Sequence, residues 1–114
     1  MNNSATYYPC NKQTILIDKE TGSGFWSVAG NNLQFTWFEV PAGSRFQKHS
    51  HTSEQITYVL EGDLFFQIDD CVYKVSAGDC IVIPPAKEHS VWTENSIAKA
   101  VDSSSPVNEK YVTK

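Results

Sequence analysis

The chain has 114 residues, and its 13 acidic side chains against nine lysine and arginine side chains give a formal net charge of −4. This length suits one domain, and we expect residues 1–114 to form it. The acidic balance, with Arg45 as the only arginine, argues against nucleic-acid binding, because phosphate recognition needs clustered basic side chains. No run approaches the roughly 20 apolar residues that cross a bilayer, so we expect no membrane partner and a cytoplasmic location.

Short runs of aromatic and β-branched residues dominate the chain, and turn-forming residues interrupt them about every 8 to 12 positions. This pattern predicts an all-β sandwich or barrel. The expected strands, in chain order, are 13–18, 25–29, 33–40, 46–51, 55–60, 64–69, 72–75, 80–83, 89–93 and 97–101. So many short strands favour a closed barrel or a double-sheet jelly roll, because open sheets would expose too many edges. The serine-rich stretch 103–106 is expected to be a loop.

The three histidines of the chain point to a metal site. His49 and His51 are two positions apart, so on a strand both imidazoles project from one face, about 7 Å apart along the backbone. His89 begins a later expected strand, after the Pro84-Pro85 turn. A single histidine in a β protein is usually an ordinary core or surface residue. Three that converge suit a first-row divalent metal.

The spacing around these histidines resembles the two sequence motifs of the cupin family. The first motif spans 43–62 and contains, in order, Gly43, His49, His51, Gln55 and Gly62. The second motif spans 78–93 and contains Gly78, Pro84 and His89. In the second motif the chain has Ala86 where the family usually has Gly, and Thr93 where it usually has Asn. The resemblance implies a small cupin domain, a double-stranded β-helix or jelly-roll barrel, with one metal in its mouth.

The cupin resemblance assigns four metal ligands, which are His49, His51, Gln55 and His89. The implied metal is a divalent transition ion: Zn, Ni, Mn, Fe or Cu. Gln55 stands where the family usually has Glu, and its neutral carbonyl would leave the cation more strongly Lewis acidic and less tightly held. Strand alternation turns Glu54 away from the face of Gln55. Two alternatives stay open: that Glu54 binds instead, or that Gln55 only orients a ligand histidine.

A narrower resemblance is to the KdgF-type cupins of pectin and alginate breakdown, and it rests on residues 54–62, 83–85 and 102–111. Those cupins open the ring of unsaturated uronates to a linear keto sugar acid. The resemblance implies that Asp102 is a catalytic residue. Ser104 and Asn108 stand where the pattern has Phe and Arg, and loss of that Arg removes the fork that clamps a substrate carboxylate. Arg45 and Lys48, expected near the barrel mouth, are the candidates to replace it.

Aromatic side chains exceed what a small monomer readily buries. If Gln55 faces the barrel interior, Tyr58 faces outward, and the same alternation from His89 turns Trp92 outward. A further aromatic group lies on the strand expected at 33–40. These side chains either form core between the two sheets or cover a subunit interface, and the second alternative predicts a homodimer.

Three classes of function fit these residues. The first is a metal-dependent enzyme that acts on a small polar, sugar-acid-like molecule by ring opening, isomerisation or cyclisation, with Asp102 as proton carrier. The second is a metal-dependent dioxygenase, because three histidines and a neutral fourth ligand leave positions for dioxygen and substrate. The third is a non-catalytic module that binds a metal or a sugar, which is favoured if Asp102 lies away from the metal.

Overall fold

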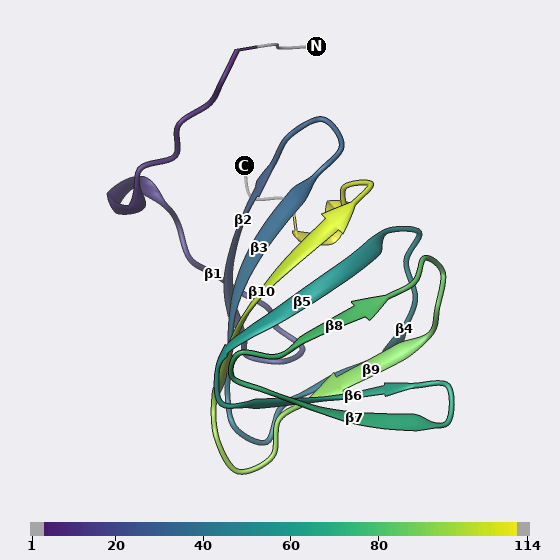
Figure 1. The fold of residues 1–114 in the computed structure, drawn as a ribbon. Helices are drawn as coiled ribbons and strands as arrows, with labels where there is room; N and C mark the ends of the chain where they lie inside the picture. The colour runs from purple at the N-terminus through teal and green to yellow at the C-terminus, as the bar shows by residue number, and fades with distance from the viewer. Residues whose placement is uncertain (1–3, 112–114) are drawn as a thin grey trace.

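The computed structural model describes residues 4–111, and almost all of its regular structure is β-strand (Figure 1). The strands are β1 (Leu16–Ile17), β2 (Gly24–Ala29), β3 (Gln34–Val40), β4 (Arg45–His49), β5 (Glu54–Glu61), β6 (Asp63–Ile68), β7 (Cys71–Ser76), β8 (Cys80–Ile83), β9 (His89–Trp92) and β10 (Ala98–Ser105). Two single-turn 3₁₀ helices, η1 (Cys10–Lys12) and η2 (Glu109–Tyr111), complete the described chain. Within these residues no helix is long and apolar enough to cross a membrane.

Two antiparallel sheets face each other and enclose a common interior (Figure 1). The larger sheet has the strand order β1-β2-β3-β10-β5-β8, and the smaller has the order β4-β9-β6-β7. Strands that are distant in sequence lie side by side, since β10 pairs with both β3 and β5. This is the double-sheet jelly roll predicted from the sequence.

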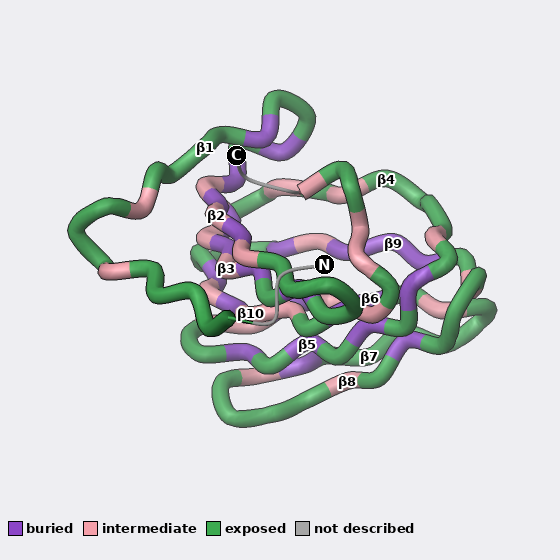
Figure 2. The backbone as a smooth tube through the Cα atoms, turned by 90° about the horizontal axis from the view of Figure 1, so that it is seen from above, coloured by how far each residue is buried: buried purple, intermediate pink, exposed green. Residues whose placement is uncertain are grey.

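Buried residues alternate with more exposed ones along strands of both sheets (Figure 2), and their apolar side chains form one core cluster. The buried apolar residues are Phe25, Phe38, Val40, Val59, Leu64, Phe66, Val75, Ile83, Val91, Ala98 and Ala100. The same inward faces also bury polar side chains, including Gln34, Thr36, Gln55, Thr57 and His89. Buried polar groups cost stability unless they are hydrogen-bonded, and these five side chains line one pocket between the sheets.

The last strand is longer than its sequence predicts. The sequence predicts a loop over 103–106, but β10 continues to Ser105. Serine has a weak strand preference, yet Ser103 pairs with Phe35 of β3 on one side and with Ile56 of β5 on the other. Pairing on both edges overrides the local preference, and it places Asp102 and Ser104 on a rigid strand.

Two motif residues shape the turns that position the smaller sheet. Gly62 connects β5 to β6 with φ 75°, and a Cβ there would lie 2.1 Å from the carbonyl oxygen of Ile97. Only glycine therefore fits at this turn. Thr93, which replaces the usual Asn, donates from its hydroxyl to the Pro41 carbonyl at 2.5 Å and accepts from the Ser44 N–H at 3.0 Å. It holds the turn from which β4 begins.

The outward side of the larger sheet carries an apolar group that we call the outer apolar face, formed by Trp26, Phe35, Trp37, Ile56, Tyr58 and Val82. Strand pairing aligns these side chains in rows, since Trp26 lies opposite Trp37 and Ile56 lies opposite Val82. Tyr58 is 40% exposed and Val82 is 54% exposed. Phe38 points the other way and is buried, so the aromatic residues of β3 divide between core and surface.

Candidate metal centre

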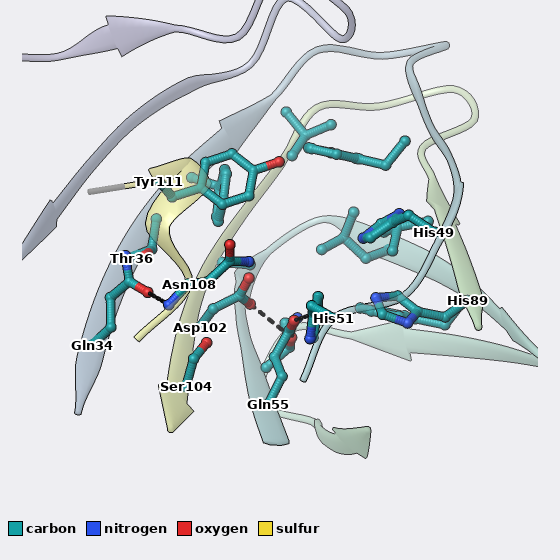
Figure 3. Close-up of a pocket in the computed structure, with 18 residues that line it drawn as sticks. Gln34, Thr36, His49, His51, Gln55, His89, Asp102, Ser104, Asn108 and Tyr111 are labelled. Carbon is teal, nitrogen blue, oxygen red and sulfur yellow. Dashed lines mark hydrogen bonds between the residues drawn. The ribbon is translucent and has the colours of Figure 1, made fainter. Parts of the chain in front are cut away.

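The three histidines converge at one end of the interior (Figure 3). Their available ring nitrogens all lie within 4.8 Å of one another. His49 ends β4 and lies opposite His89, the first residue of β9, so cross-strand pairing brings these two rings together. His51 lies just beyond β4 rather than on it. The convergence predicted from the His-x-His spacing is therefore present, with one of its members contributed by a loop.

Each imidazole of the cluster is oriented by the backbone two residues away. Nδ1 of His49 donates to the Gln47 carbonyl at 2.6 Å, and Nδ1 of His51 donates to the Ser53 carbonyl at 3.0 Å. Nδ1 of His89 donates to the Lys87 carbonyl at 2.8 Å. A carbonyl oxygen can only accept, so these bonds place the proton of each neutral ring on Nδ1 and leave the Nε2 lone pair available for a metal.

Gln55 provides a fourth donor atom beside the histidines. Its side chain is buried, and its Oε1 lies 3.0 Å from Nε2 of His51. With the His51 proton on Nδ1, both atoms of this contact are hydrogen-bond acceptors, and a proton or a cation between them is needed to satisfy it. Glu54 is exposed on the other face of β5, as strand alternation predicted. Three imidazole nitrogens and one carbonyl oxygen form a donor set that suits a divalent transition metal.

Burial keeps His89 in the form that binds a metal. Desolvation lowers the pKa of His89, and the hydrogen bond to the Lys87 carbonyl opposes that shift, while the nearby His49 and His51 add to the lowering. The neutral imidazole is the metal-binding form, so this environment favours ligation over protonation.

The turn before β9 positions His51 by a backbone contact. Ala86 has φ 60°, the left-handed conformation that favours glycine, so it adopts the geometry expected of the glycine that cupins usually have here. Its N–H donates to the His51 carbonyl at 2.8 Å. The second motif therefore supports a histidine of the first.

Asp102 lies on β10, in the wall opposite the histidines, and lines the same pocket (Figure 3). Thr57 donates from its hydroxyl to Asp102 Oδ1 at 2.7 Å, and Gln55 Nε2 donates to Thr57 Oγ1 at 3.0 Å. Burial raises the pKa of the Asp102 carboxyl to about 6, and the hydrogen bond from Thr57 opposes the shift. A carboxyl with a pKa near neutrality can both hold and release a proton at ordinary pH.

The residues that close the pocket on the side of β3 have no signature in the sequence motifs. Tyr111 packs edge-on against Phe25 and Phe38, with ring centroids 5.3 and 5.1 Å away. Desolvation raises the pKa of its phenol, and the carboxylates of Asp18 and Asp102 raise it further. Tyr111 reaches this place because the short segment after β10 folds back over the pocket.

Gln34 anchors that segment. Its Oε1 accepts from the backbone N–H of Asn108 at 2.6 Å, and its Nε2 donates to Ser27 Oγ at 3.0 Å. Gln34 is 2% exposed. Its inward position on β3 was the sequence signal that could have revealed this contact, because a buried polar side chain needs a hydrogen-bond partner.

The two basic side chains expected at the mouth lie elsewhere. Arg45 stacks over the Trp92 ring at 4.5 Å, and Lys48 is exposed 4.0 Å from Glu88. Within residues 4–111, no lysine or arginine lines the pocket that contains the histidines. The expectation that Arg45 or Lys48 replaces the missing clamp is therefore wrong. The register of β4 shifts between Phe46 and His49, and Arg45 packs on Trp92 while Lys48 lies beside Glu88, outside the pocket.

The family assignment agrees with this geometry. The profile of the cupin domain matches residues 36–103, which is more than half of the chain and includes all three histidines, Gln55 and Asp102. The chain belongs to the cupin family. Its fold also matches solved cupin structures over nearly its whole length.

Two of those structures illustrate the match. KdgF from Halomonas sp. superposes with a TM-score of 0.82 at 21% identity, covering 94% of this chain and 98% of that one. An RmlC-like cupin from Shewanella frigidimarina gives a TM-score of 0.84 at 23% identity, covering 98% of this chain and 100% of that one. At these identities the cupin chain shares a fold with both proteins.

Curated relatives match shorter stretches. An uncharacterized protein of Methanocaldococcus jannaschii is 43% identical over 53 residues, which are 46% of this chain and 42% of that protein. An acireductone dioxygenase of Leishmania major is 33% identical over 70 residues, which are 57% of this chain and 20% of that enzyme. The chain thus spans less than half the length of either relative.

Proposed function

We propose that this cupin is a metal-dependent enzyme that acts on a small polar molecule, with His49, His51, Gln55 and His89 as metal ligands and Asp102 as proton carrier. The observation that carries the proposal is the cluster of three ring nitrogens within 4.8 Å, each ring oriented by a backbone carbonyl. A divalent cation bound there would polarise a hydroxyl or carbonyl oxygen of the substrate.

The placement of Asp102 supports an enzyme over a module that only binds. Its carboxyl lies in the same pocket as the histidines, and its pKa near 6 lets it accept a proton from a substrate carbon or hydroxyl and return it to a neighbouring atom. Ring opening, isomerisation and cyclisation of a hydroxylated molecule all consist of such transfers. Phe38, Phe46 and Phe66 belong to the apolar part of the pocket lining and would limit the water around the reacting atoms.

The polar wall indicates how a substrate would be held. Thr36, Ser104 and Asn108 line the pocket beside Asp102 and offer neutral hydrogen-bonding groups suited to substrate hydroxyls. We expect the carboxylate of a sugar acid to bind the cation here, because no lysine or arginine among residues 4–111 lines the pocket. This requirement separates the present chain from cupins that clamp a carboxylate with arginine.

The test begins with protein purified without an affinity tag and analysed for metals. The metal-loaded protein is then incubated with unsaturated uronates, aldoses and linear sugar acids, and the products are followed by NMR. Conversion should require metal and should fall by roughly 10²-fold or more in Asp102→Asn, the size of effect typical for loss of a proton-transfer group. Conversion that persists at the wild-type rate in Asp102→Asn would remove Asp102 from the mechanism.

A second candidate function is a metal-dependent dioxygenase. It is favoured by the 33% identity to the acireductone dioxygenase of Leishmania major and by a donor set in which Gln55 is neutral. Oxygen uptake with iron- or nickel-loaded protein and an enediol substrate distinguishes the two candidates. Consumption of dioxygen in step with substrate would favour the dioxygenase, and conversion without oxygen uptake would favour the isomerase-type reaction.

A further inference from the structure

The side-chain amide of Gln55 can bind a cation in only one of its two orientations. The carbonyl oxygen of an amide is a ligand, whereas its NH₂ group is a hydrogen-bond donor that repels a cation. The two groups are close in size, so packing alone does not decide which of them faces His51. Whatever fixes this orientation controls the fourth ligand.

A directed chain of hydrogen bonds fixes it. The hydroxyl of Thr57 has one proton, which it donates to Asp102 Oδ1 at 2.7 Å. The Thr57 oxygen is then left to accept, and it accepts from Nε2 of Gln55 at 3.0 Å. The Gln55 Oε1 consequently faces Nε2 of His51, also at 3.0 Å. If the amide were reversed, the Gln55 oxygen would face the Thr57 oxygen, and both atoms would be hydrogen-bond acceptors with no proton between them.

Burial and strand pairing make this arrangement rigid. Thr57 is 1% exposed and Gln55 is 9% exposed, so water does not readily replace either partner. Thr57 lies directly opposite Asp102 in the pairing of β5 with β10, and Gln55 lies on the same inward face two residues earlier. The three side chains therefore keep their relative positions as part of the sheet.

We propose that Thr57 is a positioning residue for the metal centre: with Asp102 as its acceptor, it turns the Gln55 carbonyl toward the histidines. The inference rests on the proposed function, in which Gln55 is a ligand. In this arrangement a hydroxyl that is hydrogen-bonded to Gln55 and Asp102 determines the metal affinity, and Asp102 contributes through Thr57 as well as by carrying a proton.

The experiment measures Zn²⁺ affinity by competition with a chromophoric chelator. Thr57→Val keeps the shape of the side chain but removes the hydroxyl. It should weaken Zn²⁺ binding by about 10- to 100-fold, the typical effect of losing a residue that is hydrogen-bonded to a metal ligand. Thr57→Ser keeps the hydroxyl, so its Zn²⁺ affinity should stay within about threefold of the wild-type value. Thr21→Val removes a hydroxyl that is also buried but lies outside the pocket, so it controls for general loss of stability.

The decisive comparison repeats Thr57→Val in a Gln55→Glu background. Both oxygens of a carboxylate can bind a cation, so no orientation remains to be fixed, and the loss caused by Thr57→Val should shrink to about threefold or less. An equal loss in both backgrounds, or no loss with Gln55 present, would overturn the role of Thr57. If the wild-type protein itself fails to bind Zn²⁺, the proposed function fails instead.

Discussion

Thr57 and Asp102 face each other across the pairing of β5 with β10, and the hydroxyl of one donates to the carboxylate of the other at 2.7 Å inside the pocket. This bond partly compensates a carboxyl group that has been removed from water. The remaining desolvation is large enough to raise the pKa of Asp102 to about 6. The residue proposed to carry a proton is thus also a source of pH-dependent stability.

Asp102→Asn should make the metal-free protein more stable at pH 7.5. The pKa of the Asp102 carboxyl is about 6 in the folded protein, and its ordinary value, taken for the unfolded chain, is 3.8. Between pH 3.8 and about pH 6 the folded state therefore holds a proton that the unfolded state has released. The wild type should therefore gain stability as pH falls from 7.5 to 4.5 relative to the variant. The difference at pH 7.5 should be at most about 3 kcal/mol in urea unfolding, since the shift is about two pKa units and one unit corresponds to about 1.4 kcal/mol.

Asp70→Asn serves as the control for this measurement, because Asp70 is an exposed turn residue. It should leave the pH dependence of the unfolding free energy as it is in wild type. Parallel pH profiles for wild type and Asp102→Asn would show that the carboxyl titrates normally, and would count against its proposed role.

The protein should bind about one divalent transition metal per chain, and binding should weaken below about pH 6, because protons compete for imidazoles whose ordinary pKa is near 6.5. His49→Ala removes one of the three nitrogens and should reduce binding by at least about tenfold. Cys71→Ser removes an exposed thiol outside the cluster and should have no effect. Elemental analysis and titration at several pH values provide the measurement. Native protein that contains no metal and takes none up would refute the assignment.

Gln55→Glu and Gln55→Ala should change metal binding in opposite directions. The carboxylate should tighten binding by charge attraction, yet make the cation a weaker Lewis acid, so turnover should fall while occupancy rises. The alanine variant should lower occupancy. Metal affinity and turnover measured on the same preparations give the comparison. Equal affinity in wild type and both variants would place Gln55 outside the coordination sphere.

The outer apolar face should be the interface of a homodimer. Its side chains form rows across neighbouring strands, and exposed apolar patches of this kind usually mark a partner surface. Light scattering should give twice the chain mass of 12.8 kDa at micromolar concentration. Tyr58→Lys should shift the protein to the monomer mass. Tyr73→Lys changes an exposed tyrosine on the smaller sheet and should not. A monomer mass for the wild type would contradict the proposal.

Motif spacing predicted the parts of the site that depend on strand period. His49 and His89 meet because two strands pair, and Gln55 points inward while Glu54 points outward because side chains alternate. The sequence also predicted most strands within a few residues. These features follow from local geometry, which a pattern of residue types can reveal.

Features that depend on contacts distant in sequence were missed. The serine-rich end of β10 is a strand only because β3 and β5 flank it, and no local preference indicates that pairing. Tyr111 closes the pocket because its ring packs edge-on against both Phe25 and Phe38, which lie more than 70 residues earlier in the chain. Residues of this kind cannot be recognised before the topology is known.

The backbone carbonyls that orient the three imidazoles have a consequence for how such a protein can evolve. Gln47, Ser53 and Lys87 provide these bonds through main-chain oxygens, so substitutions of their side chains leave the bonds available. The side chains that would touch a substrate lie mainly on β3 and β10, in the other sheet. Mutation on β3 can therefore change substrate preference while these backbone bonds keep the three histidines in place, whereas a change at Asp102 of β10 also reaches the metal centre through Thr57 and Gln55.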